Sequence, residues 1–253
     1  MIFTSALPET RFDLHFSIAR IPIRVHPLFW LMALFFGISS GNILQLLIWV
    51  VALFVSITIH ELGHAFAMKI YGQPSRVLLY LGGGLTTPEP VRWGGRWMNV
   101  SLKPAQEIIV SLAGPIAGFL FAALIVLGGV AAGGYVLVTP LFSIIPFPTV
   151  YLLNSGQLVN SIVSTFVWIN VFWGVMNLVP VYPLDGGNVT RYILVRLDPV
   201  NGMRKSMWVS FIAGCAMALM GLIVFRNGYI TLLFGYLAFQ SFMTLKGRLG
   251  GWV

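Results

Sequence analysis

The sequence is poor in charge and nearly free of cysteine. Charged residues make up 9% of its 253 residues, whereas about 25% is typical of a soluble domain, so the chain cannot cover a water-facing surface. Hydrophobic residues make up 58% and the mean hydropathy is +0.89, which predicts a polytopic membrane protein that forms one compact bundle. The single cysteine, Cys215, excludes an internal disulfide framework and a cysteine-rich metal site.

The N-terminal segment has no continuous apolar run. Residues 1–27 mix charged residues with prolines, so we expect no cleavable signal peptide and interpret the segment as a cytosolic or interfacial lead-in. Six apolar segments follow, and most approach the roughly 20 residues that a spanning helix requires, although the first is short. They lie at about 28–41, 43–68, 106–131, 156–179, 206–225 and 229–245. We therefore expect a single all-α membrane domain over residues 1–253, with about six transmembrane helices.

Acidic residues are scarcer than basic ones, with 7 against 15 and a net charge of +8. Basic chains often bind nucleic acid, but the positions of the charges favour another explanation. With six crossings and a cytosolic N-terminus, fourteen of the 15 Lys and Arg residues fall on the cytosolic side, and only Arg226 falls outside. This pattern predicts a multi-pass protein with both termini in the cytosol, whose basic residues contact anionic lipid and not nucleic acid.

Two connections between the apolar segments are more than simple turns. Residues 72–104 contain VLLYLGGGLTTPEP, in which strand-like runs, a glycine triplet and prolines predict a small membrane-associated β-hairpin over about 77–90. We expect it on the cytosolic side, with the part around Leu78–Leu85 as a candidate strand edge where another chain can pair. A loop packed on the bundle is the alternative. Residues 132–155 carry no charge and three prolines, and are expected to form an apolar or partly embedded outer loop.

One helix-length apolar segment contains the ionisable pattern HELGH. His60 and His64 are four residues apart, so on a helix they lie about 40° apart around the axis and point to one side. Two neutral imidazoles placed in this way can hold Zn²⁺, and Glu61 can reach a water at the metal instead of the metal itself. This is the HExxH pattern of metalloproteases. Ionisable groups inside a spanning segment are costly and rare, which favours a functional site.

A zinc site of this kind needs a third protein ligand and an open position for water. Asp185, within NLVPVYPLDGG, is the acid in the most unusual surroundings, because two prolines precede it and two glycines follow it. The charge pattern also puts HELGH and PLDGG at the cytosolic ends of the second and fourth predicted helices, and so at one depth. The alternative is that Asp185 only caps the helix GGNVTRYILVRL. Glu107 begins the third predicted helix, where an acid suits the helix dipole without any further role.

HELGH, SLAGPIAG at residues 111–118 and NLVPVYPLDGG together resemble the site-2 protease family of intramembrane zinc metalloproteases (peptidase M50-like). The resemblance runs from about residue 20 to 245 and is to the compact forms without a PDZ or CBS domain. It implies one Zn²⁺ per chain held by His60, His64 and Asp185, with Glu61 as the catalytic acid and base. It also implies that Asn177 lies near the scissile carbonyl of the substrate.

The family resemblance further implies hydrolysis of peptide bonds in or near transmembrane segments of membrane-protein substrates. A bacterial inner membrane is the expected location, and the site is expected near its cytosolic face. The lipid bilayer is the expected surrounding, and a homo-oligomer or a regulatory membrane protein is a candidate partner.

Three other interpretations of the same residues stay open. An ion carrier could use His60, His64 and Asp185 as a transport site, but Glu61 would then have no role, and the sequence shows no inverted repeat. A catalytically dead scaffold is disfavoured because the ligands and the base are all present. A zinc protease of the CAAX-processing type also uses HExxH in a membrane, but an L-D-G aspartate is not the third ligand of that family.

Overall fold

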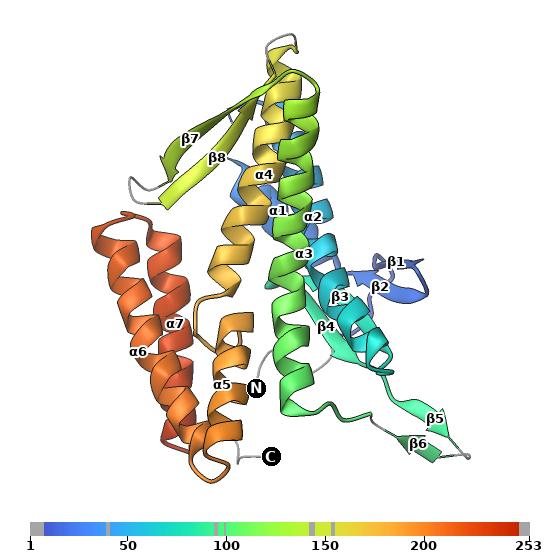
Figure 1. Ribbon diagram of the computed structural model, residues 1–253, viewed down its shortest axis with the longest axis vertical. Coiled ribbons are helices and arrows are strands. Elements are labelled where there is room, and N and C mark those ends of the chain that lie inside the picture. Colours follow the sequence, from blue (N-terminus) through green and yellow to red (C-terminus); the bar gives the residue numbers. More distant parts are fainter. Residues whose placement is uncertain are drawn as a thin grey trace. The chain divides into compact units, whose positions relative to one another are not determined.

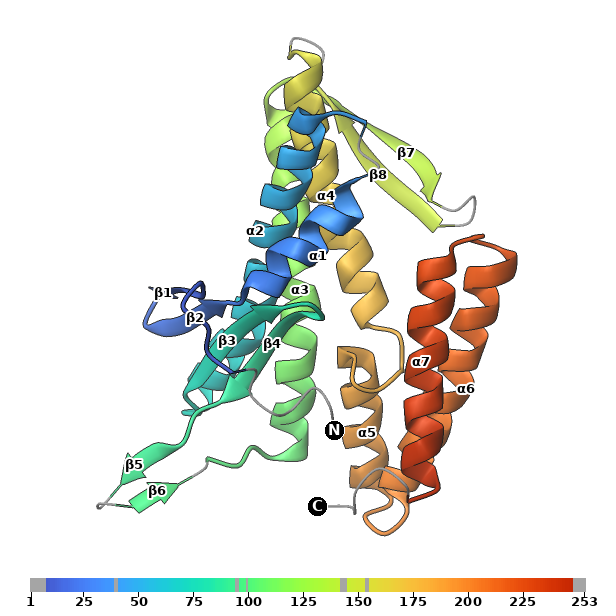
Figure 2. The same ribbon diagram turned by 180° about the vertical axis from the view of Figure 1, so that it is seen from behind.

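The computed structural model describes residues 8–38, 41–93, 96–98, 100–141, 145–152 and 155–247 (Figure 1, Figure 2). The chain forms two compact units, which we name the helix–sheet unit and the C-terminal unit. The helix–sheet unit consists of Glu9–Leu102 and Ala113–Val175, and the C-terminal unit consists of Met1–Pro8, Lys103–Leu112 and Met176–Val253. The expectation of a single domain stays a prediction.

Helices dominate the structure, as the hydropathy pattern predicts. The helices of the described residues are α1 Pro27–Gly37, α2 Ile43–Ile70, α3 Pro104–Ala131, α4 Gln157–Asn177, α5 Asp185–Leu197, α6 Gly202–Ile223 and α7 Gly228–Leu245. Within the described ranges, five of them (α2, α3, α4, α6 and α7) are long and apolar enough to cross a membrane. The first expected span is the 11-residue α1, which at 1.5 Å per residue is about 16 Å long, half the usual hydrocarbon thickness.

A four-stranded sheet accompanies the helices in the helix–sheet unit (Figure 2). Its strands are β1 Leu14–Ile18, β2 Ile21–Val25, β3 Ser75–Tyr80 and β4 Gly83–Pro88, in the order β1-β2-β3-β4. The β3–β4 pair confirms the expected hairpin. The N-terminal lead-in, for which the sequence analysis predicts no strand, supplies β1 and β2. The strand β2 precedes α1 and the strand β3 follows α2. Because these two strands pair in parallel, both helices are connected to the same sheet.

The position of the sheet edge differs from the expectation. The candidate edge around Leu78–Leu85 spans both strands of the hairpin, and β3 is not an edge strand, because β2 pairs with it on one side and β4 on the other. Only the β4 part of that segment is at the outer position of the sheet order. A hairpin alone would expose both strands, and the N-terminal strand pair removes one of those edges.

Two further hairpins occupy connections between helices. They are β5 Val91–Trp93 with β6 Arg96–Met98, and β7 Tyr135–Leu141 with β8 Ile145–Tyr151. The second pair lies in the connection that was expected to be an outer loop. It is rich in Val, Ile, Tyr and Phe, which fit a pleated strand better than a helix.

The core of the helix–sheet unit lies between the sheet and helices α1 and α2. Alternate residues of β2 and β3 are buried, including Ile23, Val25, Val77 and Leu79, as expected for strands with one covered face. Phe29 of α1 is fully buried in the same cluster. Complete burial of such a side chain contributes about 1.5–3 kcal/mol, so this cluster fixes the sheet firmly against the helix that carries HELGH.

In the C-terminal unit, α6 and α7 lie side by side (Figure 1). A Cβ atom added at Gly214 would lie 2.9 Å from Cβ of Ala238, so the two backbones approach closely through small residues. Ser210 and Ser241 share a hydrogen bond of 2.8 Å between the helices, and Ser210 also accepts a bond of 2.7 Å from the backbone N–H of Tyr182. These contacts hold the loop that leads into α5.

Candidate metal centre and catalytic residues

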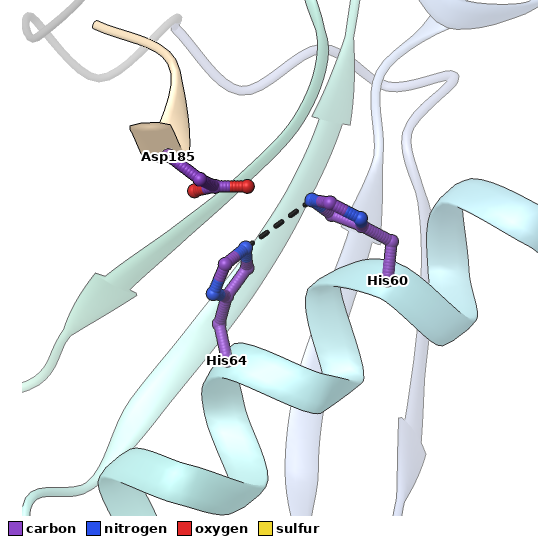
Figure 3. Close-up of side chains that lie close together, drawn as sticks. All are labelled: His60, His64 and Asp185. Atoms are coloured by element: carbon purple, nitrogen blue, oxygen red, sulfur yellow. Dashed lines mark hydrogen bonds between the residues drawn. The ribbon is translucent and has the colours of Figure 1, made fainter. Parts of the chain in front are cut away.

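The two histidines of HELGH face each other on α2. Both are buried, with exposed fractions of 3% for His60 and 7% for His64. Their Nε2 atoms lie 3.2 Å apart (Figure 3). Two nitrogen ligands bound tetrahedrally to one zinc at about 2.0–2.1 Å are separated by about 3.3–3.4 Å. The helix therefore presents the imidazoles at nearly the spacing that a shared metal requires.

Glycines let helix α3 approach the histidines closely. An added Cβ atom at Gly63, between the two histidines in sequence, would collide with the backbone oxygen of Ala113 on α3. An added Cβ atom at Gly114 would collide with the imidazole of His64. The glycine of HELGH and the first glycine of SLAGPIAG thus have a common physical reason, because a larger side chain at either position would push α3 away from the face of α2 that carries the histidines.

Asp185 is the first residue of α5 and lies partly buried. The N-cap of this helix is Leu184, so the alternative in which Asp185 serves as the cap is wrong. The potential ligand atoms of His60, His64 and Asp185 all lie within 4.8 Å of one another (Figure 3). Two imidazoles and one carboxylate form the donor set of many catalytic zinc sites, which keep a fourth position open for water. These three residues lie close enough to hold one metal ion.

Glu61 is buried beside the histidines, with 5% of its surface exposed. The hydroxyl of Thr86 on β4 donates a hydrogen bond of 2.7 Å to Oε2 of Glu61 and lies 3.1 Å from its backbone oxygen. Burial raises the pKa of Tyr80 on β3, and the negative charge of Glu61 raises it further. The sheet is thus in direct contact with the acid of HELGH, and nothing in the local pattern around Thr86 indicates this contact.

The two amides of α4 differ in their surroundings. Asn177, expected near the scissile carbonyl, is the last residue of α4 and is partly buried, and its role stays a prediction. Asn170, to which the sequence assigns no function, is 2% exposed and donates hydrogen bonds of 2.8 Å to Oγ of Ser56 on α2 and to the backbone oxygen of Phe166. An amide in an apolar helix is the signal that could have identified this link between helices.

Known proteins share this combination of sequence and fold. Residues 48–221 match the model of peptidase family M50. A zinc metalloprotease of Methanocaldococcus jannaschii is 28% identical over 236 residues, which cover 91% of this chain and 56% of that protein. A Synechocystis sp. protein provisionally named a zinc metalloprotease is 30% identical over 193 residues, covering 70% of this chain and 43% of that protein. The chain thus spans about half the length of these relatives.

A solved structure gives the same fold. The site-2 protease from Methanocaldococcus jannaschii superposes with a TM-score of 0.54 at 23% identity, covering 96% of this chain and 98% of that chain. In this chain the fold combines membrane-length helices and a small sheet with two histidines and an aspartate that lie close enough to hold one metal ion. The chain belongs to peptidase family M50. The resemblance seen in the sequence is therefore confirmed, whereas the roles of the individual residues stay predictions.

Proposed function

We propose that this chain is an intramembrane zinc metalloprotease that hydrolyses peptide bonds in or near the transmembrane segments of membrane proteins. His60, His64 and Asp185 would hold one Zn²⁺, and Glu61 would be the catalytic acid and base. The observation that carries the proposal is the approach of the three ligand side chains to within 4.8 Å, next to a buried glutamate.

The chemistry follows from the positions of these side chains. A bound zinc ion supplies a Lewis acid that makes water nucleophilic near neutral pH. Glu61 takes one proton from the attacking water while the oxygen of that water bonds to the scissile carbonyl carbon. Glu61 later delivers the proton to the leaving amine as the C–N bond breaks. The amide of Asn177 would hydrogen-bond the substrate backbone or the negative charge that develops on the carbonyl oxygen. Burial of Glu61 keeps bulk water from competing for its proton.

An extended substrate is required, because a helix shields its carbonyl groups within its own hydrogen bonds. The outer strand β4 offers a place where a peptide can add by strand pairing. Its first residues approach Glu61 directly, since an added Cβ atom at Gly84 would collide with the side chain of Glu61. A peptide paired with β4 would therefore run past the proposed base.

We also propose that both termini are cytosolic and that the site opens near the cytosolic face, in a bacterial inner membrane. The fourteen-to-one distribution of basic residues supports this orientation. The pairing of β2 with β3 requires the segments before α1 and after α2 to lie on one side of the membrane, and the distribution of basic residues indicates that this side is the cytosolic one.

The decisive experiment combines cleavage with metal analysis in the purified full chain. The wild type should cleave a membrane-tethered reporter with about one zinc per chain, and a chelator should abolish cleavage. Glu61→Gln should lower cleavage by at least about 100-fold, the usual contribution of a general base, while zinc stays bound.

Glu9→Gln serves as the matched control, because Glu9 is exposed and its change should leave cleavage unaltered. Cleavage that persists in the Glu61 variant would refute the proposed mechanism. Zinc uptake into vesicles that contain the protein, without any cleavage, would favour the ion carrier instead. Membership of family M50 disfavours that function.

A further inference from the structure

The sheet holds the carboxylate of Glu61 in a defined position. Oγ1 of Thr86 lies 2.7 Å from Oε2 of Glu61 and 3.1 Å from the backbone oxygen of the same residue. A threonine hydroxyl has one proton to donate, and the shorter contact is with the carboxylate. The hydroxyl therefore donates to Oε2, and this hydrogen bond restrains the rotamer of the Glu61 side chain.

The register of the hairpin explains why Thr86 reaches α2. Thr86 pairs with Val77 and Gly84 pairs with Leu79, and both partners are buried on the covered face of the sheet. Directly opposed residues of an antiparallel pair project to the same face, so Thr86 and Gly84 also face the helix. Gly84 has no Cβ atom, which lets the β4 backbone lie against the side chain of Glu61. The carboxylate is thus held between a backbone and a hydroxyl of one strand.

Resting on the proposed function, we infer that Thr86 is a positioning residue for Glu61. Its hydroxyl orients the carboxylate toward the attacking water, and its strand is the one at which an extended substrate can add. Because β4 would carry both the substrate and the hydroxyl that holds the base, a single strand aligns the scissile bond with Glu61. The loss of this hydroxyl should therefore affect the chemical step more than substrate binding or metal binding.

Two adjacent threonines provide a matched test. Thr87 pairs with Arg76 on the opposite face of the hairpin and accepts a hydrogen bond of 3.4 Å from Nε of Arg76. Thr86→Val and Thr87→Val remove the same hydroxyl group from neighbouring positions of one strand. We expect Thr86→Val to lower kcat about 10- to 100-fold, as for the loss of a hydrogen bond to a charged group. KM should change less than twofold, and zinc should stay near one per chain.

The control variants separate positioning from folding. Thr87→Val should keep the kcat of the wild type within about twofold, and Thr86→Ser, which retains the donor, should recover kcat to within about threefold. Equal kcat in the two valine variants would overturn the inference. So would a Thr86→Val variant that lost zinc, one that raised KM without lowering kcat, or a failure of serine to restore kcat.

A second variant tests the same contact if Thr86→Val does not fold. Gly84→Ala presses on Glu61 from the backbone side, and the atoms that it meets are those of the flexible Glu61 side chain, so the protein should fold. Its kcat should fall about tenfold with zinc retained, and an unchanged kcat would overturn the inference. The proposed function is judged separately, because cleavage by Glu61→Gln would refute that function whatever the Thr86 variants do.

Discussion

Substitution of Gly114 by alanine should weaken zinc binding without unfolding the protein. The added Cβ atom would lie 2.5 Å from Cε1 and 2.8 Å from Cδ2 of the His64 imidazole, and closer still to Nε2. Favourable contacts between heavy atoms begin near 3.5 Å, so the imidazole must move by about 1 Å. Zinc–ligand distances deviate from their usual values by only about 0.2 Å, and the displaced imidazole can no longer bind the metal in its original position.

The magnitude follows from comparable perturbations. Changes that disturb the orientation of a ligand from outside the first coordination sphere weaken metal binding about 10- to 100-fold, which corresponds to about 1.4–2.8 kcal/mol. We expect a loss in this range or beyond it for Gly114→Ala. Replacement of glycine by alanine within a helix, in contrast, favours the helix by about 1 kcal/mol. The melting temperature of the zinc-free protein should therefore stay close to that of the wild type.

Gly118 provides the matched control one turn further along α3. An added Cβ atom there would lie 3.5 Å from Oδ1 and 3.6 Å from the backbone oxygen of Asn170, which is ordinary contact. Zinc affinity would be measured by competition with a fluorescent chelator, and stability by thermal unfolding of the chelator-treated protein. Gly118→Ala should bind zinc like the wild type. If Gly114→Ala binds zinc as tightly as Gly118→Ala, the assignment of His64 as a ligand held against α3 is refuted.

Two further predictions concern the membrane orientation and the N-terminal strands. Single cysteines introduced at Asn42 and Asn227, in a Cys215→Ser background, should react with an impermeant thiol reagent added from outside. A cysteine introduced at Asn201 should react only from inside, and the reverse pattern would contradict a cytosolic site. Burial raises the pKa of Asp13, but hydrogen bonds from Thr10 and Arg24 outweigh this effect and lower the pKa to about 2. The ionised Asp13 carboxylate therefore contributes fully to the stability of the fold above about pH 4, and this contribution is lost as the pH falls toward 2. Asp13 also forms an ion pair with Arg24, whose Nε lies 2.5 Å from Oδ2 of Asp13. The difference in melting temperature between wild type and Asp13→Asn should shrink over that interval, and a constant difference would show that this ion pair does not stabilise the fold.

Local patterns in the sequence predict the main helices and the pairing of the two histidines in the candidate site. Hydropathy identifies the long apolar helices, because a spanning helix requires about 20 apolar residues in succession. The spacing of HELGH brings His60 and His64 together for the same kind of reason, since residues four apart share a helix face. The glycine triplet predicts tight turning or close approach, and both occur: Gly83 has a φ of +105°, and Gly84 lies against Glu61.

Contacts between distant segments follow from the tertiary structure alone. The lead-in forms strands because β2 finds a partner in β3, about fifty residues later, and buries its apolar face on α1 and α2. The same packing makes β4 and not β3 the outer strand.

The sequence by itself determined the apolar helices and the helix that presents two potential zinc ligands on one side, because hydropathy and helical periodicity depend on residues that are neighbours in the chain. Only the tertiary structure decided that Thr86 holds Glu61 and that Gly114 lies against His64. Both contacts join residues 25 or more positions apart, and their existence depends on how whole helices and strands pack to bury their apolar faces.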